Sequence, residues 1–136
     1  MAMKFGPHTI SPQTIFIKTK YCFGFTNLRP SCEGHCLVAP NRVVQYINDL
    51  SEDERNDLLN TVNRVSKVLQ LGYKTDGVGI TVQDGVAAGQ TVPHVHFHVI
   101  PRNFPTKWKS SPNLAPEVQE ANTKKVIEFL ELYDSE

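Results

Sequence analysis

The chain has 136 residues, of which 40% are hydrophobic and 21% are charged. Its 14 basic side chains equal its 14 acidic ones, so no long-range charge draws the protein toward nucleic acid or a membrane surface. This length predicts a single domain, residues 1–136, and leaves no room for a second one.

Three short strands are predicted in the first half of the chain, at residues 14–18, 21–27 and 34–40. Each segment is rich in β-branched or aromatic residues, which favour pleated structure. Because little chain separates one segment from the next, we interpret them as an antiparallel meander.

Two amphipathic helices are predicted, one on each side of the histidine-rich region. Ser51 and Glu54 form a capping box, and apolar residues then recur at helical spacing until Gly72. A second stripe begins at about Glu117. The apolar positions are Leu58, Val62, Val65 and Leu69 in the first helix, and Val126, Phe129, Leu130 and Tyr133 in the second.

Two further strands are expected between the helices, at residues 77–83 and in the histidine segment after residue 93. The loop 84–93 would join them as a hairpin. This order of elements predicts an α+β domain with an antiparallel sheet and helices packed on one face.

The N-terminal residues, the lengths of the apolar stretches and the cysteines indicate the compartment in which the protein works. The first ten residues lack the apolar core of a signal peptide, and no stretch approaches the roughly 20 apolar residues of a membrane span. We therefore expect a cytoplasmic protein with no membrane partner. Cys22, Cys32 and Cys36 are odd in number and are interpreted as reduced, buried thiols.

Three of the five histidines fall within one pentapeptide, residues 94–98. In an extended strand Val95 and Phe97 would line one face, and His94, His96 and His98 the other. Imidazole has the side-chain pKa nearest to neutrality, so such a row can supply a nucleophile, a hydrogen-bond donor and a proton carrier.

A metal site is the first alternative interpretation of these histidines. His94 and His98 would lie about 13 Å apart along a regular strand, whereas zinc ligands lie within about 2.1 Å of the ion. No Asp, Glu or Cys is in an obvious position to complete a site with two of the three. A purely structural role is the second alternative, and the strict alternation of the three histidines argues against it.

Phosphate chemistry fits the segment better. The glycine-containing turn Gly89-Gln90-Thr91 directly precedes the histidines, and the backbone N–H groups of such a turn can hold phosphate oxygens. A neutral imidazole can attack phosphorus and split one slow displacement into two easier steps. Flanking histidines would neutralise charge on the non-bridging oxygens.

The sequence HVHFHVIPR resembles the HxHxH signature of the histidine triad (HIT) superfamily of nucleotidyl hydrolases and transferases. KFGPHTI, GHCLVAP and VQDGVAAGQTVPHVHFHVIPR are similar to the fragile histidine triad branch, the diadenosine polyphosphate hydrolases, and the resemblance covers most of residues 4–102. It implies a five-stranded antiparallel sheet with two helices, continued across a homodimer.

The resemblance also implies residue roles. His96 would attack the α-phosphorus of diadenosine triphosphate, release ADP and carry AMP until water frees it. His94, His98 and His35 would support catalysis. The implied substrate-binding residues are His8, Asn27, Gln83, Gly89, Gln90, Thr91, Val92 and His98. No tightly bound cofactor is expected, and Mg²⁺ or Mn²⁺ would accompany the substrate phosphates.

Two alternatives remain open at this point. A Hint-like protein would cleave adenosine phosphoramidates, although Gln83 and the GQTV sequence favour the fragile histidine triad branch. A nucleotide-sensing module would turn over slowly and act through the bound complex. One departure from that branch is the short segment after Arg102, where a longer tyrosine-bearing loop is usual; it puts regulation through that loop in doubt.

Overall fold

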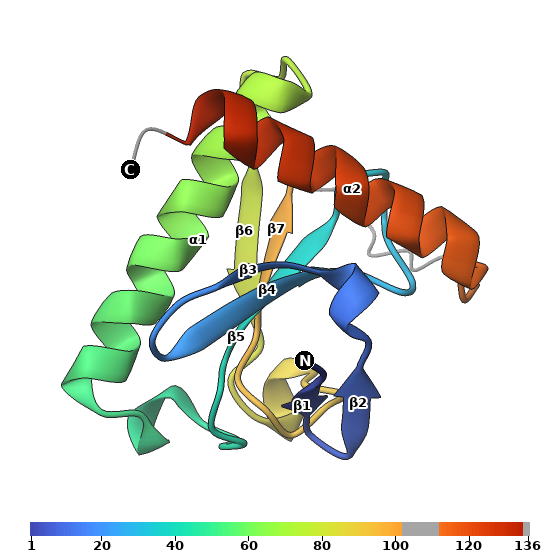
Figure 1. The fold of residues 1–136 in the computed structure, drawn as a ribbon. Helices are drawn as coiled ribbons and strands as arrows, with labels where there is room; N and C mark the ends of the chain where they lie inside the picture. The colour runs from blue at the N-terminus through green and yellow to red at the C-terminus, as the bar shows by residue number, and fades with distance from the viewer. Residues whose placement is uncertain (102–111, 135–136) are drawn as a thin grey trace.

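The computed structural model describes residues 1–101 and 112–134, and in these residues five strands form one antiparallel sheet (Figure 1). The strand order is β3-β4-β5-β7-β6, with every neighbouring pair antiparallel. The predicted sheet and its initial meander are confirmed. The strands are β3 (Ile15–Lys18), β4 (Cys22–Thr26), β5 (Cys36–Pro40), β6 (Gly79–Val82) and β7 (Phe97–Ile100).

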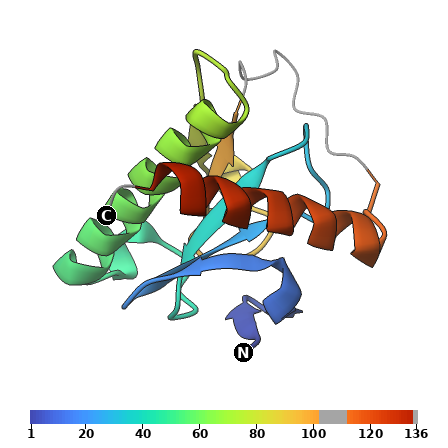
Figure 2. The ribbon, with the colours of Figure 1, turned by 45° about the horizontal axis from the view of Figure 1, so that its top comes forward.

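The two predicted helices are α1 (Glu52–Gly72) and α2 (Pro116–Tyr133), and both cover the same face of the sheet (Figure 2). At the start of α1, the Ser51 hydroxyl accepts a hydrogen bond from the Glu54 N–H, and the Glu54 carboxylate accepts one from the Ser51 N–H. The predicted capping box therefore forms. Neither helix is long and apolar enough to cross a bilayer.

A hydrophobic core fills the space between the helices and the sheet. The apolar residues predicted for the first helix, from Leu58 to Leu69, are buried there with Val126 of α2. Cys22 and Cys36 belong to the same core, as expected of buried thiols, whereas Cys32 is only partly buried. Burial raises the pKa of Cys22 to about 12, so its thiol stays protonated and packs as an apolar group.

The opposite face of the sheet is partly covered by an N-terminal hairpin that the sequence did not predict. Its strands are β1 (Met3–Phe5) and β2 (His8–Ile10), joined by a turn in which Gly6 has a φ of 56°. Phe5 packs edge-on against Phe25 of β4, with ring centroids 5.2 Å apart. The hairpin thereby forms a wall over part of the sheet face opposite the helices, and it lies at the bottom of the view in Figure 1.

The prediction of one continuous histidine strand is wrong in part, because the regular strand begins only at Phe97. Pro93 has no N–H to donate, and the Val95 N–H donates to the carbonyl of Val44, outside the sheet, at 2.8 Å. The alternation still holds. Val95 is buried in the core on the helix side, whereas His96 points to the opposite face.

Candidate active site

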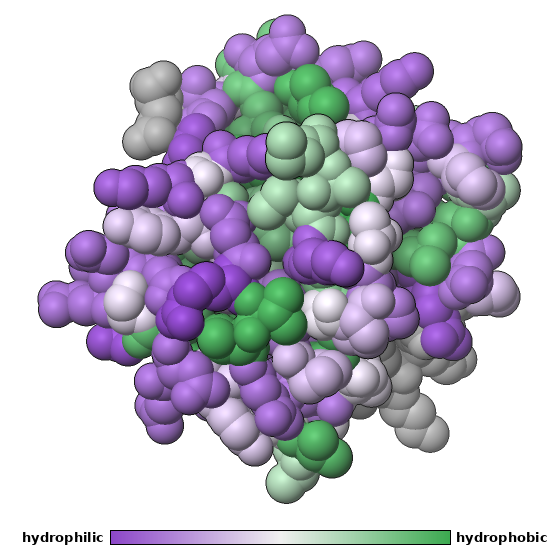
Figure 3. Space-filling model, turned by 60° about the horizontal axis from the view of Figure 1, so that its bottom comes forward, coloured by the Kyte–Doolittle hydropathy of each residue, from purple (hydrophilic) through white to green (hydrophobic). Residues whose placement is uncertain are grey.

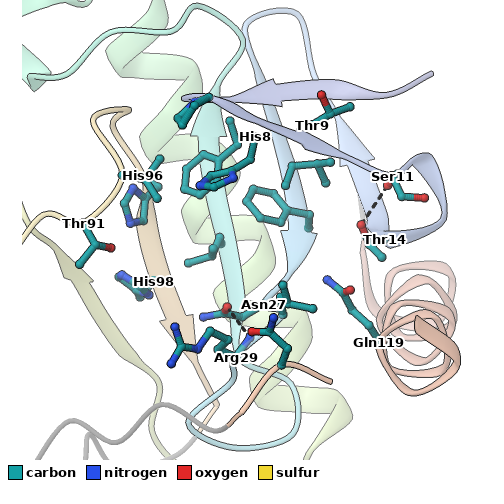
Figure 4. A pocket seen from close by; sticks show the side chains of 18 residues that line it. His8, Thr9, Ser11, Thr14, Asn27, Arg29, Thr91, His96, His98 and Gln119 are labelled. Atoms are coloured by element: carbon teal, nitrogen blue, oxygen red, sulfur yellow. Dashed lines mark hydrogen bonds between the residues drawn. The ribbon is translucent and has the colours of Figure 1, made fainter. Parts of the chain in front are cut away.

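A cavity of about 1000 Å³ lies between the N-terminal hairpin, the sheet, the loop after β4 and the start of α2 (Figure 4). Ligand sites in proteins commonly measure roughly 300–1000 Å³, so this one has room for more than a mononucleotide. Its lining residues are Phe5, Pro7, His8, Thr9, Ile10, Ser11, Thr14, Phe25, Asn27, Leu28, Arg29, Leu37, Thr91, Val92, His96, His98, Asn113 and Gln119.

One part of the cavity wall is apolar and aromatic. Phe5, Phe25 and Leu37 form a buried cluster on this face of the sheet, and Phe5 also packs at right angles against His96, with centroids 4.9 Å apart. The side of the molecule that carries the hairpin is mostly hydrophilic, with apolar side chains gathered near its middle (Figure 3). Such a wall suits a flat, weakly polar ring that reaches the histidines.

His96 is held as a neutral imidazole with a defined tautomer. Its Nδ1 atom lies 2.7 Å from the backbone carbonyl oxygen of His94. Because a carbonyl oxygen can only accept, Nδ1 carries the hydrogen and Nε2 keeps its lone pair. Burial also lowers the pKa of His96. The ring therefore presents the electronic form that a nucleophile needs at neutral pH.

His94 is completely buried and does not line the cavity. Its Nδ1 accepts a hydrogen bond from the Gly6 N–H at 2.8 Å, and its Nε2 lies 2.8 Å from the carbonyl oxygen of Pro40, to which it donates. Both ring nitrogens are thus engaged by the hairpin and the sheet. The contact of His94 with His96 is made through its backbone carbonyl, and its supporting role in catalysis stays a prediction.

His98 is oriented by His35, another buried histidine. The Ser31 N–H donates to Nδ1 of His35 at 2.9 Å, so the hydrogen of that neutral ring lies on Nε2. Nε2 is 3.0 Å from Nδ1 of His98, which accepts its hydrogen; the Asn27 amide nitrogen, 3.3 Å from the same Nε2, is itself a donor and cannot accept it. His98 consequently carries its own hydrogen on Nε2. Burial lowers the pKa of His35 to about 4, and burial with the neighbouring imidazoles lowers that of His98 to about 3.

His96 and His98 are therefore neutral rings in opposite tautomers, with centroids 5.0 Å apart. One presents an Nε2 lone pair and the other an Nε2–H. A nucleophile beside a hydrogen-bond donor is the arrangement that phosphoryl-group displacement requires. In this tautomer the Nε2–H of His98 is able to donate a hydrogen bond to a phosphate oxygen.

The predicted substrate-binding residues divide into two groups. His8, Asn27, Thr91, Val92 and His98 line the cavity. Gln83, Gly89 and Gln90 are not among its lining residues.

These three residues shape the loop that carries Thr91 and Val92. Gly89 has a φ of 95°, and a Cβ atom there would lie 2.6 Å from Nε2 of Gln83. The Gly89 and Gln90 N–H groups donate to the carbonyls of Val86 and Gly85, and the Gln90 side chain donates to the carbonyl of Gln45. The predicted backbone cradle for phosphate is therefore already engaged at these two positions.

The sequence analysis missed several cavity residues from the hairpin, from the loop after β4 and from the region of α2. Arg29 of that loop and Gln119 of α2 are the clearest examples (Figure 4). Gln119 lies on a helix distant in sequence, and its side chain is tied to the sheet by a hydrogen bond from Nε2 to the Thr26 carbonyl at 3.0 Å. Nothing in the local pattern around either residue indicates a binding role.

The residues that the structure describes contain no group of three His, Cys, Asp or Glu side chains placed to hold a metal ion. The segment that follows Arg102, whose shortness was noted above, lies outside the described residues.

The sheet order, the two helices on one face and the buried histidine pair on the other define a domain of the histidine triad class. Residues 8–104 match the HIT domain family, and the chain belongs to that family, as the resemblance implied.

Relatives in the fragile histidine triad branch match much of the chain. The bis(5'-adenosyl)-triphosphatase of Dictyostelium discoideum is 36% identical over 132 residues, which are 97% of this chain and 88% of that protein. The bifunctional bis(5'-adenosyl)-triphosphatase/adenylylsulfatase of Arabidopsis thaliana is 42% identical over 72% of this chain, a match that spans 54% of that protein.

Two solved structures share the fold closely. The NitFhit protein of Caenorhabditis elegans superposes with a TM-score of 0.85 at 34% identity, covering 94% of this chain and 30% of that one. The diadenosine triphosphate hydrolase of Plasmodium falciparum gives a TM-score of 0.85 at 30% identity, covering 96% of this chain and 85% of that one.

Proposed function

We propose that this chain hydrolyses diadenosine triphosphate to AMP and ADP. The observation that carries the proposal is the pair of opposite tautomers at His96 and His98, in the wall of a cavity large enough for a nucleotide with further phosphates. The relatives named as bis(5'-adenosyl)-triphosphatases support the same activity.

The reacting adenosine would occupy the apolar part of the cavity. The rings of Phe5 and Phe25 and the side chain of Leu37 offer the base an apolar contact surface. Asn27 stands at the polar edge of this region, where it would meet the ribose hydroxyls. This placement brings the α-phosphate to His96.

In the first chemical step, the Nε2 lone pair of His96 would attack the α-phosphorus while the bond to the bridging oxygen breaks. ADP departs with the electron pair of that bond, as a stable phosphate anion that needs no strong general acid. The positive charge that develops on the His96 ring is stabilised through Nδ1–H by the His94 carbonyl. The His98 Nε2–H would donate to a non-bridging oxygen.

In the second step, water would attack the phosphorus of the AMP-imidazole intermediate. The bond to Nε2 breaks, its electrons return to the ring, and the proton lost by water goes to solvent. Mg²⁺ or Mn²⁺ would enter with the substrate, bound by its phosphates.

The protein would work in the cytoplasm as a homodimer. Sedimentation of the purified protein tests the homodimer.

Hydrolysis in water enriched in oxygen-18 tests the site of attack. The label should appear in AMP and be absent from ADP, because water attacks the adenylylated enzyme. Label in ADP would overturn the proposal. Rapid acid-free quenching with substrate labelled in adenine should also trap protein-bound AMP, and a His96→Ala variant should bind substrate, trap none and lose turnover by several orders of magnitude.

A substrate comparison separates this function from that of a phosphoramidase. The wild-type protein should turn over diadenosine triphosphate with a higher kcat/KM than AMP linked to lysine through a P–N bond. A large preference for the phosphoramidate would place the chain in the Hint-like branch instead. A His96→Ala variant that kept the protein's full biological effect would favour the nucleotide-sensing role.

A further inference from the structure

Arg29 is unusual among the residues that line the cavity. Within the described parts of the chain, it is the only lining residue, apart from the imidazoles, whose side chain can carry a charge. Burial holds His96 and His98 in the neutral form. The triphosphate chain of a dinucleotide is strongly anionic, and among the described residues of this wall the guanidinium is the one permanent cation that it can meet.

The backbone of Arg29 is fixed relative to the reacting histidines. Its N–H donates to Oδ1 of Asn27 at 3.0 Å, and the Asn27 N–H donates to the His35 carbonyl at 3.0 Å. The Ser31 N–H binds the same His35 through its ring. Hydrogen bonds to the backbone and the ring of His35 therefore hold the loop of residues 27–31, and the same ring orients His98.

A second brace comes from the segment that leads into α2. The Leu114 N–H donates to the Leu28 carbonyl at 3.0 Å, and the neighbouring Asn113 joins Arg29 in the cavity wall. Arg29 is thus held between two parts of the fold, although its side chain is exposed at the rim.

Arg29 lines the same cavity as His96 and His98. In the view of Figure 4, His98 lies between His96 and Arg29. The leaving oxygen departs from the side of the phosphorus opposite the nucleophile. A leaving group that departs on the side opposite His96 stays within the cavity whose wall includes both His98 and the exposed Arg29.

We propose that Arg29 binds the phosphates of the leaving nucleotide and so selects substrates whose leaving group carries phosphate groups. The planar guanidinium can grip two phosphate oxygens at once, a contact that lysine cannot reproduce. The inference rests on the proposed function for its choice of substrate, and it adds a specificity residue outside the histidine segment.

Two substrates with the same adenylyl group test it. One is diadenosine triphosphate, and the other is the para-nitrophenyl ester of AMP, whose leaving group carries no phosphate. Arg29→Gln should lower kcat/KM about tenfold to a hundredfold for the first and change it less than about twofold for the second. Arg29→Lys should recover part of the loss. Lys124→Gln, which removes an exposed charge of α2 away from the cavity, should leave both substrates unaffected.

Equal losses on both substrates, or no loss on either, would overturn the role of Arg29. Calorimetric binding of ADP and AMP keeps this outcome separate from failure of the proposed function. If the wild-type protein hydrolyses no dinucleotide, the proposed function fails. The Arg29 assignment then stands only if Arg29→Gln abolishes the tighter binding of ADP relative to AMP. It falls if the ratio of the two dissociation constants is the same in the variant as in the wild type.

Discussion

The Nε2 atom of His35 lies 3.0 Å from the Nδ1 atom of His98, and the hydrogen that joins them belongs to His35. The Ser31 N–H determines this direction, because it needs the lone pair on the other nitrogen of His35. A backbone amide in a loop thus sets which nitrogen of a cavity histidine can donate to substrate. The two hydrogen bonds from Ser31 to His35 and from His35 to His98 therefore connect the backbone of the loop to the tautomer of His98.

Replacing His35 should impair catalysis more than substrate binding. His35→Leu removes the donor to His98, so His98 can exchange tautomers and lose the hydrogen that points to substrate. We expect kcat to fall about tenfold to a hundredfold, a typical effect of losing the partner that orients a functional histidine, with KM nearly unchanged. Steady-state kinetics measures this.

His35→Gln serves as the matched variant, since its side-chain amide can still donate a hydrogen bond to Nδ1 of His98. It should recover part of kcat, and nitrogen NMR of the His98 ring should show the Nε2–H form in the wild type and a mixture in His35→Leu. An unchanged kcat in His35→Leu would show that catalysis does not depend on the hydrogen bond from His35 to His98.

Gly6 couples the N-terminal hairpin to the reacting imidazole. Its φ of 56° disfavours any side chain, and a Cβ atom there would lie 2.7 Å from Cγ1 of Val92. Gly6→Ala should therefore displace the hairpin and break the Gly6 N–H bond to His94. We expect kcat to fall and KM to rise together, because the His94 carbonyl that holds His96 shifts along with the cavity wall.

Lys4→Ala is the control for this effect. Lys4 lies in the same hairpin, is exposed and does not line the cavity, so its replacement should leave kcat and KM near the wild-type values. If Gly6→Ala loses stability but retains both kinetic constants, the coupling between hairpin and imidazole is absent.

The capping box of α1 should contribute to stability without affecting the site. Ser51→Ala removes the hydroxyl that accepts from the Glu54 N–H at 3.1 Å. The free energy of unfolding should fall by about 1 kcal/mol, as for other N-cap replacements. Urea denaturation measures the change, and kcat should stay the same. Ser51→Asp, which can still cap, should lose much less.

The sequence predicted the helices well because their signals are local. A capping box and an apolar stripe lie within one stretch of chain, and α1 runs over Glu52–Gly72 as expected. The hairpin β1–β2 escaped prediction because strands of three residues carry too little alternation to recognise. The irregular start of the histidine segment depends on a hydrogen bond to Val44, a contact that only the folded chain reveals.

The same distinction applies to the site. The signature at residues 94–98 indicated His96 and His98 directly, and both line the cavity. Their tautomers could not be predicted, because these depend on the Ser31 amide and the His94 carbonyl, whose positions come from tertiary structure. Gln119 was missed for a related reason, since a polar residue of the last helix shows no link to the histidines until α2 packs across the sheet.

Acid should destabilise the protein through its buried imidazoles before it affects its buried carboxylate. Burial lowers the pKa of His35 to about 4 and that of His98 to about 3, whereas the unfolded-state value is about 6.5. As the pH falls below about 6.5, these two histidines become protonated in the unfolded chain but stay neutral in the folded protein. Their contribution to stability is therefore complete above that pH and is lost as the pH falls toward 4 and then 3.

Glu54 allows the two effects to be separated. A hydrogen bond from the Arg42 guanidinium holds the pKa of its carboxyl at about 2, below the ordinary 4.5, so its contribution is lost only below about pH 4.5. Urea unfolding between pH 7 and 5 should thus show a decline in the free energy of unfolding that is shallower in His98→Gln and unaltered in slope in Glu54→Gln. A wild-type free energy that stays constant over this range would mean that the folded imidazoles accept protons as readily as unfolded ones.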